Sequence, residues 1–262
     1  MLTLKEILEK TAKNELAVAE AEKMVRMLAI AEVEGVAKID TAREHRNGIP
    51  EIILAENKAI SDVVEIALRV LDENGRVIVS RFNPDQIAAL SKALPDGAVV
   101  QVNEKARIVT MKKKDFVTRN TGGKIGLLTA GTSDIPVAEE AKVIAQEMGC
   151  QVYASYDVGV AGIHRLLQPL KDLTMNDVDV IVVVAGREGA LSSVVAGMVN
   201  VPVIAVPTSN SYGFGEKGLA TLMAMLQSCS LGMAVVNIDA GVAAGAMATL
   251  IANRAAKFRS KP

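Results

Sequence analysis

Five apolar segments alternate with helix-like segments over the second half of the chain, and this alternation constrains the fold more than any other feature. The apolar segments span residues 124–131, 150–159, 178–186, 202–209 and 233–239. The helix-like segments that follow them span residues 135–149, 164–173 (with Pro169 expected to interrupt the helix), 191–199, 216–229 and 240–254. Strands that alternate with helices of this length form right-handed βαβ crossovers. We therefore predict an α/β protein with a doubly wound, mainly parallel five-stranded sheet.

The first part of the chain is less regular and predicts a smaller α/β domain. Its expected elements are helices over 3–34, 61–73 and 84–94, a strand over 76–81, and one long strand or a hairpin over 98–114. A polar segment that contains glycine follows, which is typical of a linker. We therefore expect an N-terminal domain over 1–117 and the sheet domain over 118–262.

The composition excludes several classes of protein. The formal net charge of -1 gives no general attraction to nucleic acid or to an anionic membrane. The amino terminus lacks the basic and apolar regions of a signal peptide, and no segment reaches the roughly 20 apolar residues of a spanning helix. Two cysteines make no disulfide framework. We expect a reduced cytoplasmic protein that binds neither nucleic acid nor a membrane.

Segments rich in glycine and hydroxyl residues follow four of the five predicted strands. They span residues 131–134 (Gly131, Thr132, Ser133 and Asp134), 185–193, 207–216 and 239–245. Ligands of open parallel sheets bind beyond the carboxyl ends of the strands, so we expect these segments to line one site. N–H groups at a helix start hold phosphate without a basic residue, which favours a nucleotide or sugar phosphate. Asp134 or Ser133 could equally cap a helix that binds nothing.

Charged residues suggest both chemistry and binding. Glu188 directly follows an apolar strand, where a carboxylate would be partly desolvated and poised as a base. A glutamate at that position also simply favours the helix dipole. Asp40, Arg43 and Arg46 share one face if their segment is helical, and they form either a surface ion-pair network or an anion clamp.

The cysteines, the histidines and one tyrosine can each be explained by a structural role as well as by a functional one. Cys150 opens a predicted strand and is expected to be an inert core residue. Cys229 ends an apolar helix pattern, so it is either a small buried hydrophobe or a nucleophile that needs positive charge from elsewhere. His45 and His164 are too separated to indicate a metal site. Tyr212 could stack on a ligand ring or merely seal its loop.

Six longer segments carry a resemblance to a known family. They are AKIDTAREHRNGIPEII (37–53), AGTSDIPVAEEA (130–141), DVGVAGIHRLL (157–167), VVVAGREGALSSVVAG (182–197), VPVIAVPTS (201–209) and MLQSCSLGMAVVNID (225–239). The chain resembles, over essentially its whole length, the pyridinium-3,5-biscarboxylic acid mononucleotide synthases (LarB). That family makes the precursor of the nickel-pincer nucleotide, the cofactor of lactate racemase. Its C-terminal domain is similar to aminoimidazole ribonucleotide carboxylases and mutases, which implies a flavodoxin-like sheet.

The resemblance implies a carboxylase/hydrolase that acts on nicotinic acid adenine dinucleotide with CO2 as co-substrate. Cys229 would be the nucleophile and Glu188 the general base. The residues that would bind substrate are Asp40, Arg43, Arg46, Gly131, Thr132, Ser133, Asp134, Gly186, Gly189, Ser209, Tyr212 and Gly213. Mg2+ would assist the hydrolysis, through ligands that the sequence does not identify. The resemblance further implies a homo-octamer without a tightly bound organic cofactor.

Four residues and one glycine-rich segment, NSYGFGEKG (210–218), depart from the pattern expected of the family. Arg187 and Ser192 stand where methionine and proline are expected, and Ala240 and Val242 stand where a polar residue and an aromatic one are expected. These positions lie in loops that shape the pocket and bear on substrate choice. The alternative functions are an aminoimidazole ribonucleotide carboxylase or mutase of purine synthesis, and a non-catalytic nucleotide-binding regulator.

Overall fold

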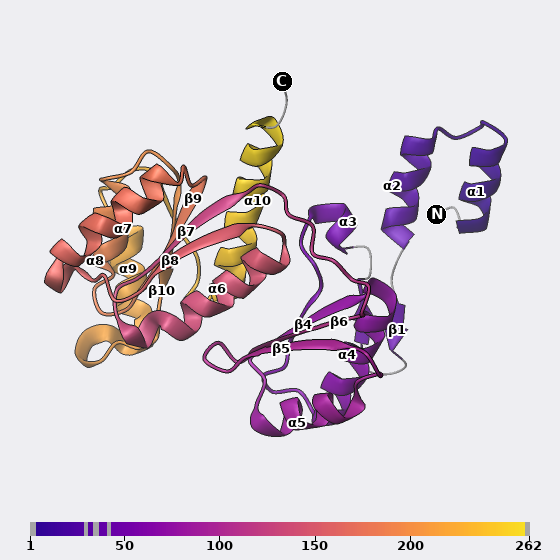
Figure 1. Ribbon diagram of the computed structural model, residues 1–262, viewed down its shortest axis with the longest axis horizontal. Coiled ribbons are helices and arrows are strands. Elements are labelled where there is room, and N and C mark those ends of the chain that lie inside the picture. Colours follow the sequence, from indigo (N-terminus) through magenta and orange to yellow (C-terminus); the bar gives the residue numbers. More distant parts are fainter. Residues whose placement is uncertain (1–3, 29–30, 34–36, 41–42, 260–262) are drawn as a thin grey trace. The chain divides into compact units, whose positions relative to one another are not determined.

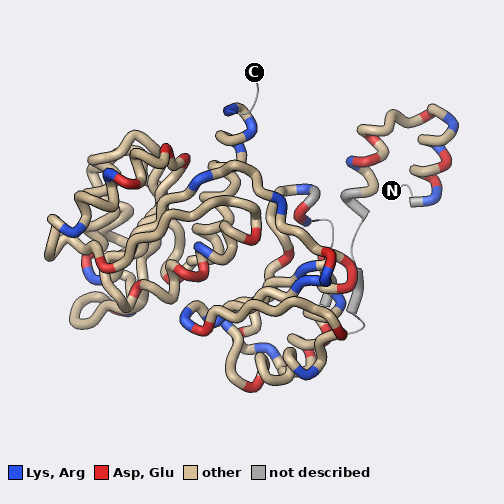
Figure 2. The backbone as a smooth tube through the Cα atoms, in the orientation of Figure 1, with Lys and Arg blue, Asp and Glu red and all other residues tan. Residues whose placement is uncertain are grey.

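Figure 1 shows the computed structural model, which describes residues 4–28, 31–33, 37–40 and 43–259. The chain divides into two compact units. The first comprises Met1–Val102 and Val109–Phe116, and the second comprises Asn103–Ile108 and Val117–Pro262. Acidic and basic residues are interspersed in both units (Figure 2). No helix within the described ranges is long and apolar enough to cross a membrane.

A five-stranded sheet forms the centre of the second unit. Its strands are β7 (Lys124–Thr129), β8 (Gln151–Ser155), β9 (Val180–Ala185), β10 (Val203–Pro207) and β11 (Met233–Val235). They lie in the order β11-β10-β9-β7-β8, and every neighbouring pair is parallel. This is the flavodoxin-like order of a doubly wound sheet, which switches direction between β7 and β9. The predicted fold class is confirmed.

Helices cover both faces of this sheet (Figure 1). They are α6 (Ile135–Glu147), α7 (His164–Met175), α8 (Ala190–Ala196), α9 (Leu219–Leu226) and α10 (Gly241–Arg259). Apolar residues of α7, α8 and α9 pack on one face, and those of α6 and α10 pack on the other. Pro169 does not interrupt its helix as predicted, because burial of Leu166, Leu170 and Leu173 along one face of α7 offsets the hydrogen bond that proline removes.

Small residues let α10 approach α6 closely. Ala244, Gly245 and Ala248 of α10 are buried against the sheet domain. A Cβ on Gly245 would lie 2.5 Å from the Ala141 carbonyl oxygen. The crossing of the two helices therefore requires glycine at this position.

We expect the substitution Gly245→Val to lower the free energy of unfolding by at least about 2 kcal/mol, because the new side chain would collide with the backbone of α6. Met247→Val on the same helix is the matched control, since Met247 is 51% exposed. It should change stability by less than about 0.5 kcal/mol. Urea denaturation followed by circular dichroism measures both variants, and equal losses would contradict the packing account.

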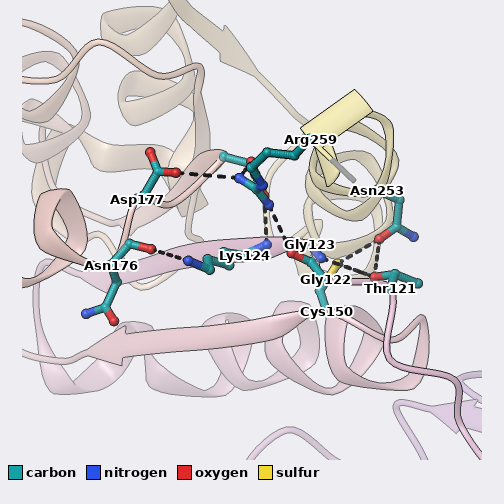
Figure 3. Close-up of polar contacts among 10 residues, drawn as sticks. Thr121, Gly122, Gly123, Lys124, Cys150, Asn176, Asp177, Asn253 and Arg259 are labelled. Carbon is teal, nitrogen blue, oxygen red and sulfur yellow. Dashed lines mark hydrogen bonds and ion pairs between the residues drawn. The ribbon is translucent and has the colours of Figure 1, made fainter. Parts of the chain in front are cut away.

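Polar contacts fix the carboxyl-terminal part of α10 to the segments that precede β7 and β9 (Figure 3). Arg259 Nη1 donates to Asp179 Oδ1 at 2.7 Å, and the Thr121 hydroxyl donates to Asn253 Oδ1 at 2.6 Å. The thiol of Cys150 donates to the same oxygen at 3.2 Å. Cys150 is buried, as predicted for a core residue, and burial raises the pKa of its thiol. This cluster holds the amino-terminal edge of the sheet together.

The first unit contains a four-stranded mixed sheet and a separate antiparallel pair of short strands. Its elements are α1 (Leu4–Ala12), α2 (Val18–Leu28), β1 (Ala31–Val33), β2 (Ala37–Ile39), α3 (Arg43–Asn47), β3 (Ile52–Leu54), α4 (Ile60–Asn74), β4 (Arg76–Ser80), α5 (Pro84–Ala93), β5 (Val99–Asn103) and β6 (Ile108–Lys112). The four strands lie in the order β3-β4-β6-β5, and residues of α4 fill the core beside them.

The prediction of one helix over 3–34 is wrong. Asn14 adopts a left-handed conformation (φ 56°) just after α1, and the chain then turns into the separate helix α2. A strand, β1, begins at Ala31, and residues 3, 29–30 and 34 of the predicted helix lie outside the described part of the chain. Of the two readings of residues 98–114, the structure contains the hairpin.

Candidate functional site

A cavity of about 410 Å³ lies at the carboxyl-terminal edge of the five-stranded sheet. Its walls come from the loops after β7, β8, β9 and β10, beside the point at which the strand order reverses. The predicted site residues among its lining are Gly131, Ser133, Asp134, Gly186, Glu188 and Tyr212. Six of the predicted site residues therefore line one cavity of this unit.

One of the four loops expected at the cavity is replaced by another. The segment that follows β11, residues 239–245, contributes no lining residue, whereas Gly159, Val160, Ala161 and Arg165 after β8 do. The reason is strand order: β8 pairs with β7, one of the two strands at the switch point, while β11 lies at the far edge of the sheet. The sequence pattern identifies the strands but not their order.

Asp134 connects two walls of the cavity. It is 3% exposed, and its Oδ2 accepts from the Gly131 N–H at 2.9 Å. Its Oδ1 accepts from the Thr208 hydroxyl at 2.8 Å, and the Asn210 amide donates to the Ser133 carbonyl at 2.6 Å. Burial raises the pKa of Asp134, against the lowering effect of these hydrogen bonds. Asp134 thus ties the β7 loop to the end of β10, and its side chain does not cap α6.

Glu188 sits on a tight turn between β9 and α8. The Gly189 N–H donates to the Gly186 carbonyl at 2.9 Å, so that Arg187 and Glu188 form the tip of the turn. A Cβ on Gly186 would lie 2.8 Å from the Thr208 hydroxyl oxygen, and glycine is therefore required there. Both tip residues are exposed and line the cavity. A base at this position can reach a ligand in the cavity.

Two arginines of the cavity were not assigned to the site from the sequence. Arg165 on α7 donates from Nη1 to Asp157 Oδ2 at 2.7 Å. The guanidinium carbon of Arg187 lies 3.9 Å from the centroid of the Tyr212 ring. Arg165 lies within one of the segments that carry the family resemblance, and Arg187 was noted only as a departure from it. Neither signal says that the two side chains face one cavity.

Four further predicted residues belong to the same loops but are not among the residues that line the cavity. They are Thr132, Gly189, Ser209 and Gly213. The Ser209 N–H donates to Asp239 Oδ1 at 2.9 Å, which ties the β10 loop to the loop after β11. Their roles in substrate binding stay predictions.

Cys229 is exposed, so the reading of it as a buried hydrophobe is wrong. It lies between α9 and β11 and is not among the residues that line the cavity. The neighbouring Ser228 hydroxyl hydrogen-bonds that of Ser193 at 2.8 Å, beside the middle of α8. The chain then continues to the amino-terminal edge of the sheet, where the Gly232 carbonyl accepts from the Val203 N–H at 2.9 Å.

The charged cluster of the first unit forms ion pairs within that unit. Arg46 pairs with Asp40, and Arg43 Nη1 lies 3.2 Å from Glu51 Oε2. Helix α3 begins only at Arg43, so Asp40 precedes the helix instead of sharing its face. Of the two predicted alternatives, an ion-pair network and an anion clamp, the geometry matches the ion-pair network. A role of these residues in substrate binding stays a prediction.

The described residues do not form a ready metal site. No group of three or more His, Cys, Asp or Glu side chains among them is placed to hold an ion. Asp134, the buried carboxylate of the cavity, uses its oxygens for hydrogen bonds to the surrounding loops. The described residues thus identify no ligands for the expected Mg2+, which stays a prediction.

Comparisons with known proteins agree with the two-part organisation. Residues 31–114 match the family described as LarB/PurE-like N-terminal domain, and residues 124–261 match AIR carboxylase. An uncharacterized protein of Methanocaldococcus jannaschii is 42% identical over 253 residues, which cover 95% of this chain and 96% of the relative.

Two relatives of known activity match part of the chain. The N5-carboxyaminoimidazole ribonucleotide mutase of Thermotoga maritima is 27% identical over 106 residues, 39% of this chain and 60% of that enzyme. The enzyme of the same name from Pyrococcus horikoshii is 28% identical over 120 residues, 44% of this chain and 64% of that enzyme.

Proposed function

Since this chain belongs to the LarB family, with an AIR carboxylase domain at its carboxyl terminus, we propose that it carboxylates nicotinic acid adenine dinucleotide. The family matches indicate a carboxylase- or mutase-type enzyme. The proposed reaction adds CO2 at C5 of the pyridinium ring and hydrolyses the phosphoanhydride, giving pyridinium-3,5-biscarboxylic acid mononucleotide and AMP. The observation that carries the proposal is the cavity at the strand switch point, where Gly131, Gly186 and Glu188 meet.

The cavity offers distinct groups to the two ends of a nicotinate mononucleotide. The Gly131–Ser133 turn lies directly before α6, where backbone N–H groups and the positive end of the helix dipole favour a phosphate. Glu188 lines the cavity from the neighbouring β9 loop. With the phosphate on the β7 loop, the pyridinium ring would lie within reach of this carboxylate.

Covalent catalysis solves the central difficulty of the reaction, which is that a pyridinium ring and CO2 are both electrophiles. Addition of the Cys229 thiolate at C4 converts the ring to a neutral dihydropyridine whose C5 is nucleophilic. C5 attacks CO2 to form the new C–C bond and leaves an iminium at N1. Glu188 removes the proton from C5, and expulsion of the thiolate from C4 restores the aromatic pyridinium. Water then cleaves the phosphoanhydride.

The position of Cys229 bears on how many chains build one site. Glu188 lines the cavity and Cys229 does not, although Cys229 is exposed. Large apolar side chains near the cysteine are also exposed, Leu226 by 65% and Leu231 by 91%. A homo-oligomer would cover them. In the proposed enzyme, the thiol of one chain therefore enters the cavity of a neighbouring copy.

The direct test is incubation of the full chain with nicotinic acid adenine dinucleotide and 13C-labelled bicarbonate, followed by mass spectrometry. We expect AMP and a pyridinium mononucleotide that carries one labelled carboxylate. Absence of the labelled product, together with retained folding and dinucleotide binding, would contradict the proposed reaction.

A carboxylase or mutase of an aminoimidazole ribonucleotide is the second candidate. The matches to two N5-carboxyaminoimidazole ribonucleotide mutases favour it, although they cover less than half of this chain. Turnover of an aminoimidazole ribonucleotide in the same assay, without turnover of the pyridinium dinucleotide, would select this candidate. The exposed Cys229 has no role in that reaction.

A further inference from the structure

Arg187 presents a guanidinium group to the cavity from a constrained backbone. Its φ of 53° is left-handed, a conformation that costs energy for any residue except glycine. The Thr221 hydroxyl donates to its carbonyl oxygen, and Gly186 and Gly189 close the turn around it. The backbone is thus held in a strained position that carries the side chain into the cavity lining.

The charge of Arg187 differs from that of the other arginine in the cavity. Arg165 is neutralised by Asp157, with 2.7 Å between Nη1 and Oδ2. Among the residues that the structure describes, Arg187 makes no ion pair, and its guanidinium lies over the Tyr212 ring. The buried carboxylate of Asp134 is directed to Gly131 and Thr208. Arg187 therefore keeps its N–H donors available for a ligand.

The stack of Arg187 on Tyr212 determines which part of a ligand can approach. At 3.9 Å from the ring centroid, the guanidinium occupies one face of the tyrosine ring, so a cationic pyridinium cannot take that face without displacing it. An anionic substituent, in contrast, can accept hydrogen bonds at the edge of the guanidinium while the stack persists. The aromatic ring thus fixes the plane in which Arg187 donates.

We propose that Arg187, oriented by the face of Tyr212, binds an oxyanion group of the nucleotide ligand, either the carboxylate on its ring or its phosphate. The inference rests on the proposed function in one respect, namely that the ligand is a nicotinate nucleotide. It makes Arg187 a binding and specificity residue. The pair of hydrogen bonds from a planar guanidinium matches both carboxylate and phosphate geometry.

Three probes distinguish the two oxyanions by isothermal titration. They are nicotinic acid mononucleotide, nicotinamide mononucleotide, which lacks the ring carboxylate, and nicotinic acid riboside, which lacks the phosphate. We expect Arg187→Met to lower the affinity of the protein for nicotinic acid mononucleotide at least about tenfold. If the carboxylate is the partner, nicotinamide mononucleotide binds the variant as it binds the unmodified protein. If the phosphate is the partner, the substitution leaves the affinity for the riboside unchanged and lowers the affinity for both mononucleotides.

Two further variants keep the test interpretable. Arg187→Lys retains the charge without the planar fork and should recover part of the lost affinity. Arg254→Met removes another arginine that stacks on an aromatic ring, 4.9 Å from the Phe258 centroid on α10 and outside the cavity lining, and should leave all three affinities within about twofold.

Unchanged affinity of Arg187→Met for all three probes, or an equal loss in Arg254→Met, overturns the inference and leaves the proposed function standing. Failure of the unmodified protein to bind any of the three probes overturns both. The two failures are therefore distinguishable in one set of titrations.

Discussion

Cys229→Ala is expected to abolish carboxylation, with a fall in kcat of at least about 1,000-fold, because the pyridinium C5 is not nucleophilic until a thiolate has added at C4. The affinity for nicotinic acid adenine dinucleotide should stay within about threefold, since the cavity loops, and not the thiol, supply the contacts that bind the nucleotide. Quenched-flow turnover with labelled CO2 measures the first quantity, and isothermal titration measures the second.

The same variant has a spectroscopic signature. Addition of the thiolate produces a dihydropyridine, which absorbs in the near ultraviolet, where the oxidised pyridinium ring does not. The unmodified protein mixed with dinucleotide in the absence of CO2 should show this absorbance, and Cys229→Ala should not. Cys150→Ala is the control and should keep the absorbance, because Cys150 is buried and hydrogen-bonded to Asn253. Carboxylation by Cys229→Ala at the normal rate would remove the covalent mechanism.

The sequence predicts the architecture of the sheet domain well because its period is simple. Val180–Ala185 is buried at every residue, as the unbroken apolar run in the sequence indicates for a central parallel strand. The period does not reveal strand order, and the cavity depends on that order. The loop after β8 reaches the cavity because β8 pairs with β7, which no local pattern shows.

The candidate site is predictable in part. Glycine-rich turns identify Gly131, Gly186 and Glu188 as residues of the carboxyl-terminal edge, and the cavity contains all three. The stack of Arg187 on Tyr212 joins two loops, and the sequence of neither loop predicts this contact. The sequence also does not predict the exposure of Cys229, because an apolar helix pattern such as that of α9 usually indicates burial.

Apolar residues also lie on the exposed side of α9, so its apolar pattern does not mean that Cys229 is buried within its own chain. They indicate an interaction surface. Met223 is 56% exposed and Leu226 is 65% exposed, in a helix whose other face packs on the sheet. Exposed apolar residues next to one another mark an interaction surface. The predicted homo-octamer supplies a partner of the right chemistry, a second copy of the chain, and it would bring Cys229 to a cavity other than that of its own chain.

This arrangement leads to a complementation experiment with a large expected effect. Cys229→Ala lacks the nucleophile, and Glu188→Gln lacks the base, which should lower turnover by about 10²- to 10⁴-fold. Each variant alone is therefore nearly inactive. If each site takes its cysteine and its glutamate from different chains, subunits mixed at equal amounts and reassembled should contain about one quarter intact sites. Activity should then return to roughly a quarter of the normal value.

Controls make the result decisive. The double variant, Cys229→Ala with Glu188→Gln, mixed with the unmodified protein should also leave about a quarter of the sites intact when the two residues come from different chains. It should leave about half when one chain supplies both. Failure of the two single variants to complement, with about half the activity in the double-variant mixture, would place both residues of a site in the same chain. That outcome would require the ligand itself to bridge from the cavity to the α9–β11 loop, because the cavity lining does not include Cys229.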